Sequence, residues 1–113
     1  MFIMKLKPEF FDLIKSGKKE YEVRLNDEKR QKVSVGDRII FKKEPDLFDG
    51  VIVTVEQVKR FNSFYKMAEM LSLKSLGFPD KNAEEIAEMY HKIYSEEDEK
   101  KYGVVVFKIK LVE

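Results

Sequence analysis

The sequence predicts a single α+β domain in which short strands and helices surround a hydrophobic core. Its 113 residues are enough for one such core, and 43% of them are hydrophobic. Three apolar segments, rich in β-branched residues, have the composition of strands: 38–42, 51–61 and 104–111. Two others begin with a helix-capping residue and continue with helical apolar spacing: 62–71 and 82–94.

The N-terminal part of the chain is predicted to form a strand, a helix and a second strand. The apolar run at 2–6 has the length of a short strand. Pro8 is suited to the first position of a helix, which its apolar residues extend to residue 16. Gly17 follows where a left-handed residue commonly ends a helix. The alternation at 20–25 then predicts a strand.

The rest of the chain is divided by loops and turns. The segment 33–37 is expected to end a strand and turn, with Gly36 at the turn. Ser95 is expected to cap a further helical turn that runs to Lys101. This order of elements allows a small closed barrel but does not distinguish it from an open sheet. Loops are predicted at 26–32, 43–50 and 74–81.

The helix predicted at 83–94 carries the chain's one histidine. Its buried side is expected to hold Ile86, Met89, Tyr90 and Ile93. His91 falls outside this stripe and is expected to be an ordinary surface residue. One histidine and no cysteine predict neither a metal site nor a disulfide, and we expect no cofactor.

The strand at 20–25 has the pattern with the most chemical content. Its alternation gives an apolar face, expected to enter the core, and a charged face with Glu20, Glu22 and Arg24. Lys19 lies at its entrance. A charged strand face is most often solvated. The alternative is a cleft, in which Arg24 holds a phosphate or base edge while Lys19 and Glu22 pair or shift each other's pKa.

Four of these residues resemble a known motif. Gly17, Lys19, Glu22 and Arg24 reproduce the spacing G-x-K-x-x-E-x-R that is typical of the ASCH domain, a member of the PUA-like superfamily. The resemblance extends over residues 1–113 as a single domain, and includes the short helix before the motif. It implies a small PUA-like β-barrel with flanking helices that binds RNA or a nucleotide.

The resemblance also includes the turn at 35–37 and the segment 102–105. In ASCH-like proteins the latter region lies near the cleft, which would add Tyr102 and Gly103 to the ligand-binding residues. Gly103 would allow another backbone segment or a ligand to approach closely. Tyr102 and an exposed Phe78 are candidates for stacking on a base.

Three functions remain open on this basis. The first is an RNA- or nucleotide-binding domain, in which Arg24 and Lys19 supply donors and Glu22 orients them or accepts from a base. The second is a hydrolase. A bacterial branch that resembles ASCH domains removes the N4-acetyl group of cytidine with a lysine, a threonine nucleophile and a glutamate. Its lysine matches Lys19, but its threonine falls on Glu22.

Without that threonine, Glu22 or Lys19 would have to activate water while Arg24 stabilises an oxyanion, and RNA is a further possible substrate. The third function is a protein-interaction domain, in which Glu22 and Arg24 form only a surface salt bridge. A net charge of +1 excludes a global basic field for long nucleic acids. No apolar run is long enough for a membrane span, and we expect a cytoplasmic protein.

Overall fold

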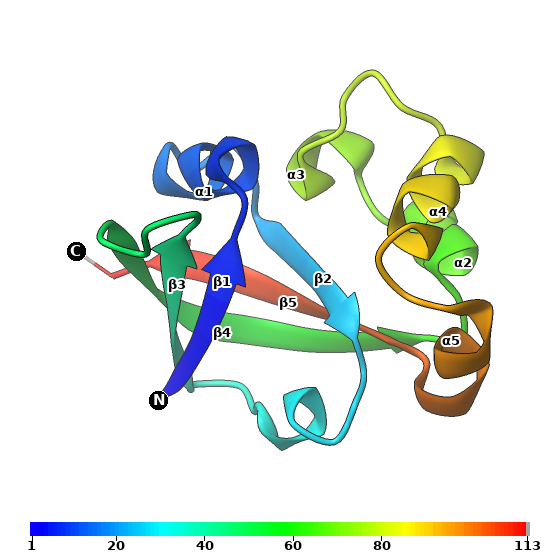
Figure 1. Ribbon diagram of the computed structural model, residues 1–113, viewed down its shortest axis with the longest axis horizontal. Coiled ribbons are helices and arrows are strands. Elements are labelled where there is room, and N and C mark those ends of the chain that lie inside the picture. The colour runs from blue at the N-terminus through cyan, green and yellow to red at the C-terminus, as the bar shows by residue number, and fades with distance from the viewer. Residues whose placement is uncertain (113) are drawn as a thin grey trace.

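A five-stranded mixed sheet runs through the structure, a computed structural model that describes residues 1–112 (Figure 1). The strand order is β1-β3-β4-β5-β2. β1 pairs with β3 in parallel, and the other three pairings are antiparallel. The strands are β1 (Phe2–Leu6), β2 (Tyr21–Leu25), β3 (Arg38–Lys43), β4 (Gly50–Phe61) and β5 (Val104–Leu111).

The sheet curls into a half-barrel whose edge strands are β1 and β2 (Figure 1). The long strand β4 contains a register shift between Val55 and Gln57, and such irregularities bend a strand and increase its twist. In Figure 1 the curl brings β1 and β2 toward each other beneath α1 (Pro8–Lys15). The predicted α+β fold with a barrel-like sheet and flanking helices is therefore confirmed.

The other helices gather beside the far end of β4 and β5 (Figure 1). Their N-terminal residues are those expected from the sequence: Ser63 accepts from Lys66 N, and Asn82 forms a capping box with Glu85. None of the helices within residues 1–112 is long and apolar enough to cross a bilayer. The gathered helices are α2 (Phe64–Met70), α3 (Leu73–Leu76), α4 (Ala83–His91) and α5 (Glu96–Tyr102), whereas the 3₁₀ helix η1 (Arg30–Lys32) lies apart from them, between β2 and β3.

Two buried clusters cover the two faces of the sheet. The first fills the inside of the curl beneath α1 and includes Phe11, Phe41 and Phe107. The second packs the other face against α2, α3 and α4, around Phe64 and Val106. Both faces of β2 are therefore covered by other parts of the chain, so its charged face is not a solvated outer face.

Four details differ from the sequence prediction. The segment 33–35 is not a strand, and the 74–81 connection begins within α3. Phe78, expected to be exposed, is only 7% exposed because it packs in the second cluster. The helix that starts at Ala83 ends at His91, so Ile93 falls beyond it and is 55% exposed rather than buried.

Candidate functional site

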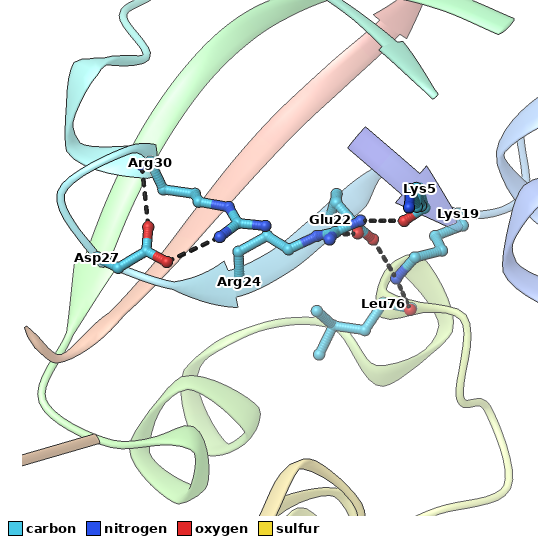
Figure 2. Close-up of polar contacts among 7 residues, drawn as sticks. All are labelled: Lys5, Lys19, Glu22, Arg24, Asp27, Arg30 and Leu76. Atoms are coloured by element: carbon cyan, nitrogen blue, oxygen red, sulfur yellow. Dashed lines mark hydrogen bonds and ion pairs between the residues drawn. The ribbon is translucent and has the colours of Figure 1, made fainter. Parts of the chain in front are cut away.

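The end of α1 positions Lys19 at the entrance of β2. Gly17 has a positive φ of 80°, which permits the left-handed turn predicted for it. The chain then folds back, and Lys19 N donates to Leu13 O at 3.0 Å. Lys19 becomes only 3% exposed, and its ammonium donates to the backbone carbonyl of Leu76 at the end of α3 (Figure 2).

The ammonium of Lys19 lies near two aromatic rings. Its Nζ is 5.7 Å from the ring centroid of Phe10 and 5.6 Å from that of Phe78. Burial lowers the pKa of Lys19 below its usual range, and Arg24 lowers it further, while the attraction of Glu22 offsets only part of this. The side chain therefore releases its proton more readily than an exposed lysine.

Glu22 lies between the two cations (Figure 2). Its Oε1 is 3.7 Å from Lys19 Nζ, and its Oε2 accepts from Arg24 Nε at 2.8 Å. Glu22 is 4% exposed, since it lies next to Phe107 of β5 on the covered inner face. The expectation of a solvated face, and of a surface salt bridge, is thus wrong for Glu22: the pair is buried.

Arg24 connects the two edges of the half-barrel. Its Nη2 donates to the backbone carbonyl of Lys5 in β1 at 2.7 Å (Figure 2). Burial disfavours its charge, but Glu22 together with Tyr94 and Tyr90 outweighs this effect and raises the pKa of Arg24. The guanidinium therefore stays protonated and fixed by two partners.

These three residues line one pocket of about 160 Å³, called here the Lys19 pocket. Its far wall comes from α4 and the residues after it. Burial, and then the charge of Glu22, raises the pKa of Tyr90, so its hydroxyl stays protonated. The Lys19 pocket is lined by Lys5, Leu6, Lys7, Phe10, Lys19, Glu22, Val23, Arg24, Glu44, Met89, Tyr90, Ile93 and Tyr94.

The sequence profile of the ASCH domain matches residues 4–113, which is nearly the whole chain. The chain belongs to the ASCH domain family. None of the curated proteins compared with it matches.

Solved structures agree with this assignment. The crystal structure of the hypothetical protein PH0355 is 39% identical, with a TM-score of 0.86 and 98% of each chain covered. The solution structure of PF0455 from Pyrococcus furiosus is 37% identical, with a TM-score of 0.72 and coverage of 99% of this chain and 97% of that one. The ASCH protein from Zymomonas mobilis is 15% identical, with a TM-score of 0.65 over 96% of this chain and 65% of that one. This last likeness concerns the fold alone.

Two of the five ligand-binding residues predicted for this ASCH domain lie elsewhere. Tyr102 and Gly103 line a second hollow of about 520 Å³, called here the Tyr102 groove. Gly103 has a φ of 75°, and a Cβ there would lie 3.0 Å from the carbonyl oxygen of Phe61, so the predicted close backbone approach is confirmed. The Tyr102 groove is lined by Asn26, Arg60, Phe61, Asn62, Lys100, Lys101, Tyr102 and Gly103.

His91 is not the ordinary surface residue expected from its sequence position. Its side chain is 30% exposed, and Nε2 lies 2.9 Å from Oε1 of the buried Glu99. The other oxygen of Glu99 accepts from Phe64 N at the start of α2. His91 and Glu99 thus tie α4, α5 and α2 together. Across residues 1–112 no three His, Cys, Asp or Glu side chains are grouped as metal ligands would be.

Sequence reasoning does not identify the wall that Tyr90, Ile93 and Tyr94 contribute to the Lys19 pocket. The apolar spacing of 83–94 predicts that Tyr90 and Ile93 enter the core, and Tyr94 is only the last residue of the predicted helix. Tyr90 is indeed buried, yet it also lines the Lys19 pocket. The only available signal was that this stripe carries tyrosines, whose hydroxyls need a polar neighbour when buried.

Proposed function

We propose that this ASCH domain binds a nucleotide, or an exposed base of RNA, in the Lys19 pocket. The observation that carries the proposal is the buried carboxylate of Glu22 in the wall of a pocket, held between Lys19 and Arg24. Buried charges are expensive to maintain, and a well-packed apolar group often gives equal or greater stability. A charged trio at a pocket is therefore better explained by a ligand than by stability.

The geometry favours a base over a phosphate in the deep part of the pocket. Within residues 1–112, Glu22 Oε1 accepts no hydrogen bond, although Lys19 lies 3.7 Å away. A carboxylate repels phosphate but accepts from the N–H groups of a base edge. Tyr94 offers a ring for stacking, and the exposed Lys5 and Lys7 stand at the rim, where a phosphate would suit them.

The test is a calorimetric titration with a panel of nucleosides, nucleoside 5′-monophosphates and short RNAs. Glu22→Gln keeps the shape of the side chain but removes its charge, and we expect the affinity to fall by roughly tenfold, about 1.4 kcal/mol. Glu56→Gln, on the exposed part of β4, is the matched control and should bind like the parent. Equal affinity of the Glu22→Gln variant and the parent would refute the proposal.

One observation favours a second candidate, the hydrolysis of an N4-acylated cytidine or of RNA. The pKa of Lys19 is lowered by burial, and a lysine of this kind can act as a general base. Neutral Lys19 would take a proton from water while the water oxygen attacks the acyl carbon. Arg24 would stabilise the oxyanion, and the C–N bond would break as the amine takes the proton from Lys19.

This candidate is tested by incubation with N4-acetylcytidine and detection of released acetate. Lys19→Met should abolish turnover, and the rate of the parent should rise as pH increases through the lowered pKa of Lys19. No turnover above the protein-free rate would leave binding as the function.

A cytoplasmic location also stays a prediction, which fractionation of the native host's cells would check.

A further inference from the structure

The Tyr102 groove differs from the Lys19 pocket in its charge. Arg60, Lys100 and Lys101 line it, and no acidic residue does. All three cations are exposed, and no ion pair found among residues 1–112 includes them. In a chain with a net charge of only +1, this is a strong local concentration of one sign. Such a surface attracts a partner with several negative charges.

The groove also offers groups suited to bases. Tyr102 is partly exposed at the end of α5, with Lys101 Nζ 5.0 Å from its ring centroid. The side-chain amides of Asn26 and Asn62 lie in the same lining. Cations beside an aromatic ring are the combination that single-stranded nucleic acid uses, because phosphates contact the cations and bases stack on the ring.

The groove and the Lys19 pocket are lined by neighbouring residues of the chain at the end of β2. Arg24 lines the pocket, and Asn26, two residues further along the same chain, lines the groove. Asn26 N donates to Gly103 O at 2.9 Å, which fixes the end of β2 against the groove. Two extended residues span at most about 7 Å. Because a duplex strand rises about 3.4 Å per nucleotide, about two nucleotides of a strand can cover this distance.

We propose that the Lys19 pocket and the Tyr102 groove form one continuous path for single-stranded RNA. The inference rests on the proposed function, since one base occupies the Lys19 pocket. The following nucleotides then run along the end of β2, with their phosphates at Arg60, Lys100 and Lys101 and one base against Tyr102. The preferred ligand is accordingly an oligonucleotide rather than a free nucleotide, which has phosphate at one position only.

The charges of helix α5 indicate which part of the helix the RNA strand would follow. Its first turn contains Glu96, Glu97 and Asp98, and its last turn contains Lys100 and Lys101. The acidic turn repels phosphates, and the basic turn is the part that lines the groove. The strand is therefore expected to follow the basic C-terminal turn of α5 and to stay away from its acidic start.

The experiment compares each nucleoside 5′-monophosphate with the RNA homopentamer of the same base, over a series of KCl concentrations. The parent should bind the best pentamer at least roughly tenfold more tightly than the monophosphate. In the triple variant Arg60→Ala/Lys100→Ala/Lys101→Ala this advantage should disappear, while monophosphate affinity stays within about twofold. The slope of log K against log salt for the pentamer should become shallower by about 2, since each phosphate contact contributes about 0.7.

A matched triple variant, Arg38→Ala/Lys15→Ala/Lys81→Ala, removes the same residue types from exposed positions that line neither hollow. It should bind the pentamer like the parent. Equal losses in both triple variants would overturn the inference, as would a pentamer that binds no more tightly than its monophosphate. A different result would refute the proposed function itself: no monophosphate binds, and Glu22→Gln leaves the affinity for the pentamer unchanged. The continuous path would then be refuted as well.

Discussion

The two ends of β2 hold charge in opposite ways. Before and along the strand, Lys19 and Glu22 are buried and Arg24 is half-buried, and these charges of mixed sign contact one another or backbone carbonyls. Beyond its end, Lys100 and Lys101 stand exposed and of one sign. Buried mixed charges are rigid, and they can discriminate between ligands. Exposed like charges are adaptable, and they attract by long-range electrostatics that salt screens.

Among these substitutions, removal of the buried charge of Glu22 should lower the free energy of unfolding most. Glu22→Ala leaves the ammonium of Lys19 and the guanidinium of Arg24 buried without their shared counter-ion. Loss of one partner from a buried pair costs about 3–5 kcal/mol in the free energy of unfolding. Urea denaturation would measure it, with Glu56→Ala on the exposed part of β4 as the control. A loss below about 1 kcal/mol would mean that the trio is open to solvent.

The second largest loss of stability is expected when the contacts of Glu99, which join α5 to α2 and α4, are removed. Glu99→Ala removes the acceptor for Phe64 N and the partner of His91. An unsatisfied buried N–H group costs about 1–3 kcal/mol, and thermal denaturation should reveal this loss. Glu97→Ala, an exposed neighbour on α5, should change stability by less than about 0.5 kcal/mol. Because α4 forms one wall of the Lys19 pocket, Glu99→Ala should also weaken nucleotide binding.

The pH dependence of stability should report the burial of Lys19. Its pKa in the folded protein is lowered from 10.5, so between the two values the unfolded chain binds more protons. The free energy of unfolding therefore rises with pH from the lowered pKa toward 10.5. Lys19→Met lacks this contribution, and the difference between parent and variant should grow in the parent's favour across that window. Parallel pH profiles of the two proteins would contradict it. Tyr90, whose pKa is also shifted, is present in both proteins, so its contribution to the pH dependence cancels in the difference between them.

The smallest change in stability is expected in the Tyr102 groove. The variant with alanine at Arg60, Lys100 and Lys101 removes three exposed charges that have no ion-pair partner within the part of the chain described. Its free energy of unfolding should stay within about 0.5 kcal/mol per site, as for other surface substitutions. A cooperative loss of several kcal/mol would show that the groove, like the Lys19 pocket, is part of the folded framework.

What could be predicted from the sequence was local. The polar trio was found because Lys19, Glu22 and Arg24 lie within six consecutive residues, where a turn and the pleat of one strand set their directions. The strands 2–6 and 104–111 were likewise predicted with the bounds that the structure has, because apolar alternation is a short-range signal.

What could not be predicted depends on packing between distant segments. Glu22 is buried because β2 belongs to a curled sheet covered on both faces, which its own alternation does not reveal. Phe78 lies between Gly77 and Pro79, which favoured an exposed loop, yet it packs beside Lys19. The family resemblance predicts Tyr102 near the cleft, whereas the structure places it in the lining of a separate hollow beside Gly103.

The hydrogen bond from Arg24 to the carbonyl oxygen of Lys5 has a consequence for self-association. β1 and β2 are the free edges of the sheet, and free edges are where strands of other molecules add. A carbonyl oxygen that already accepts from a guanidinium is less available to such an added strand. We therefore expect Arg24 to hinder addition of a strand at this edge, and light scattering of concentrated Arg24→Ala protein should detect larger particles than the parent forms.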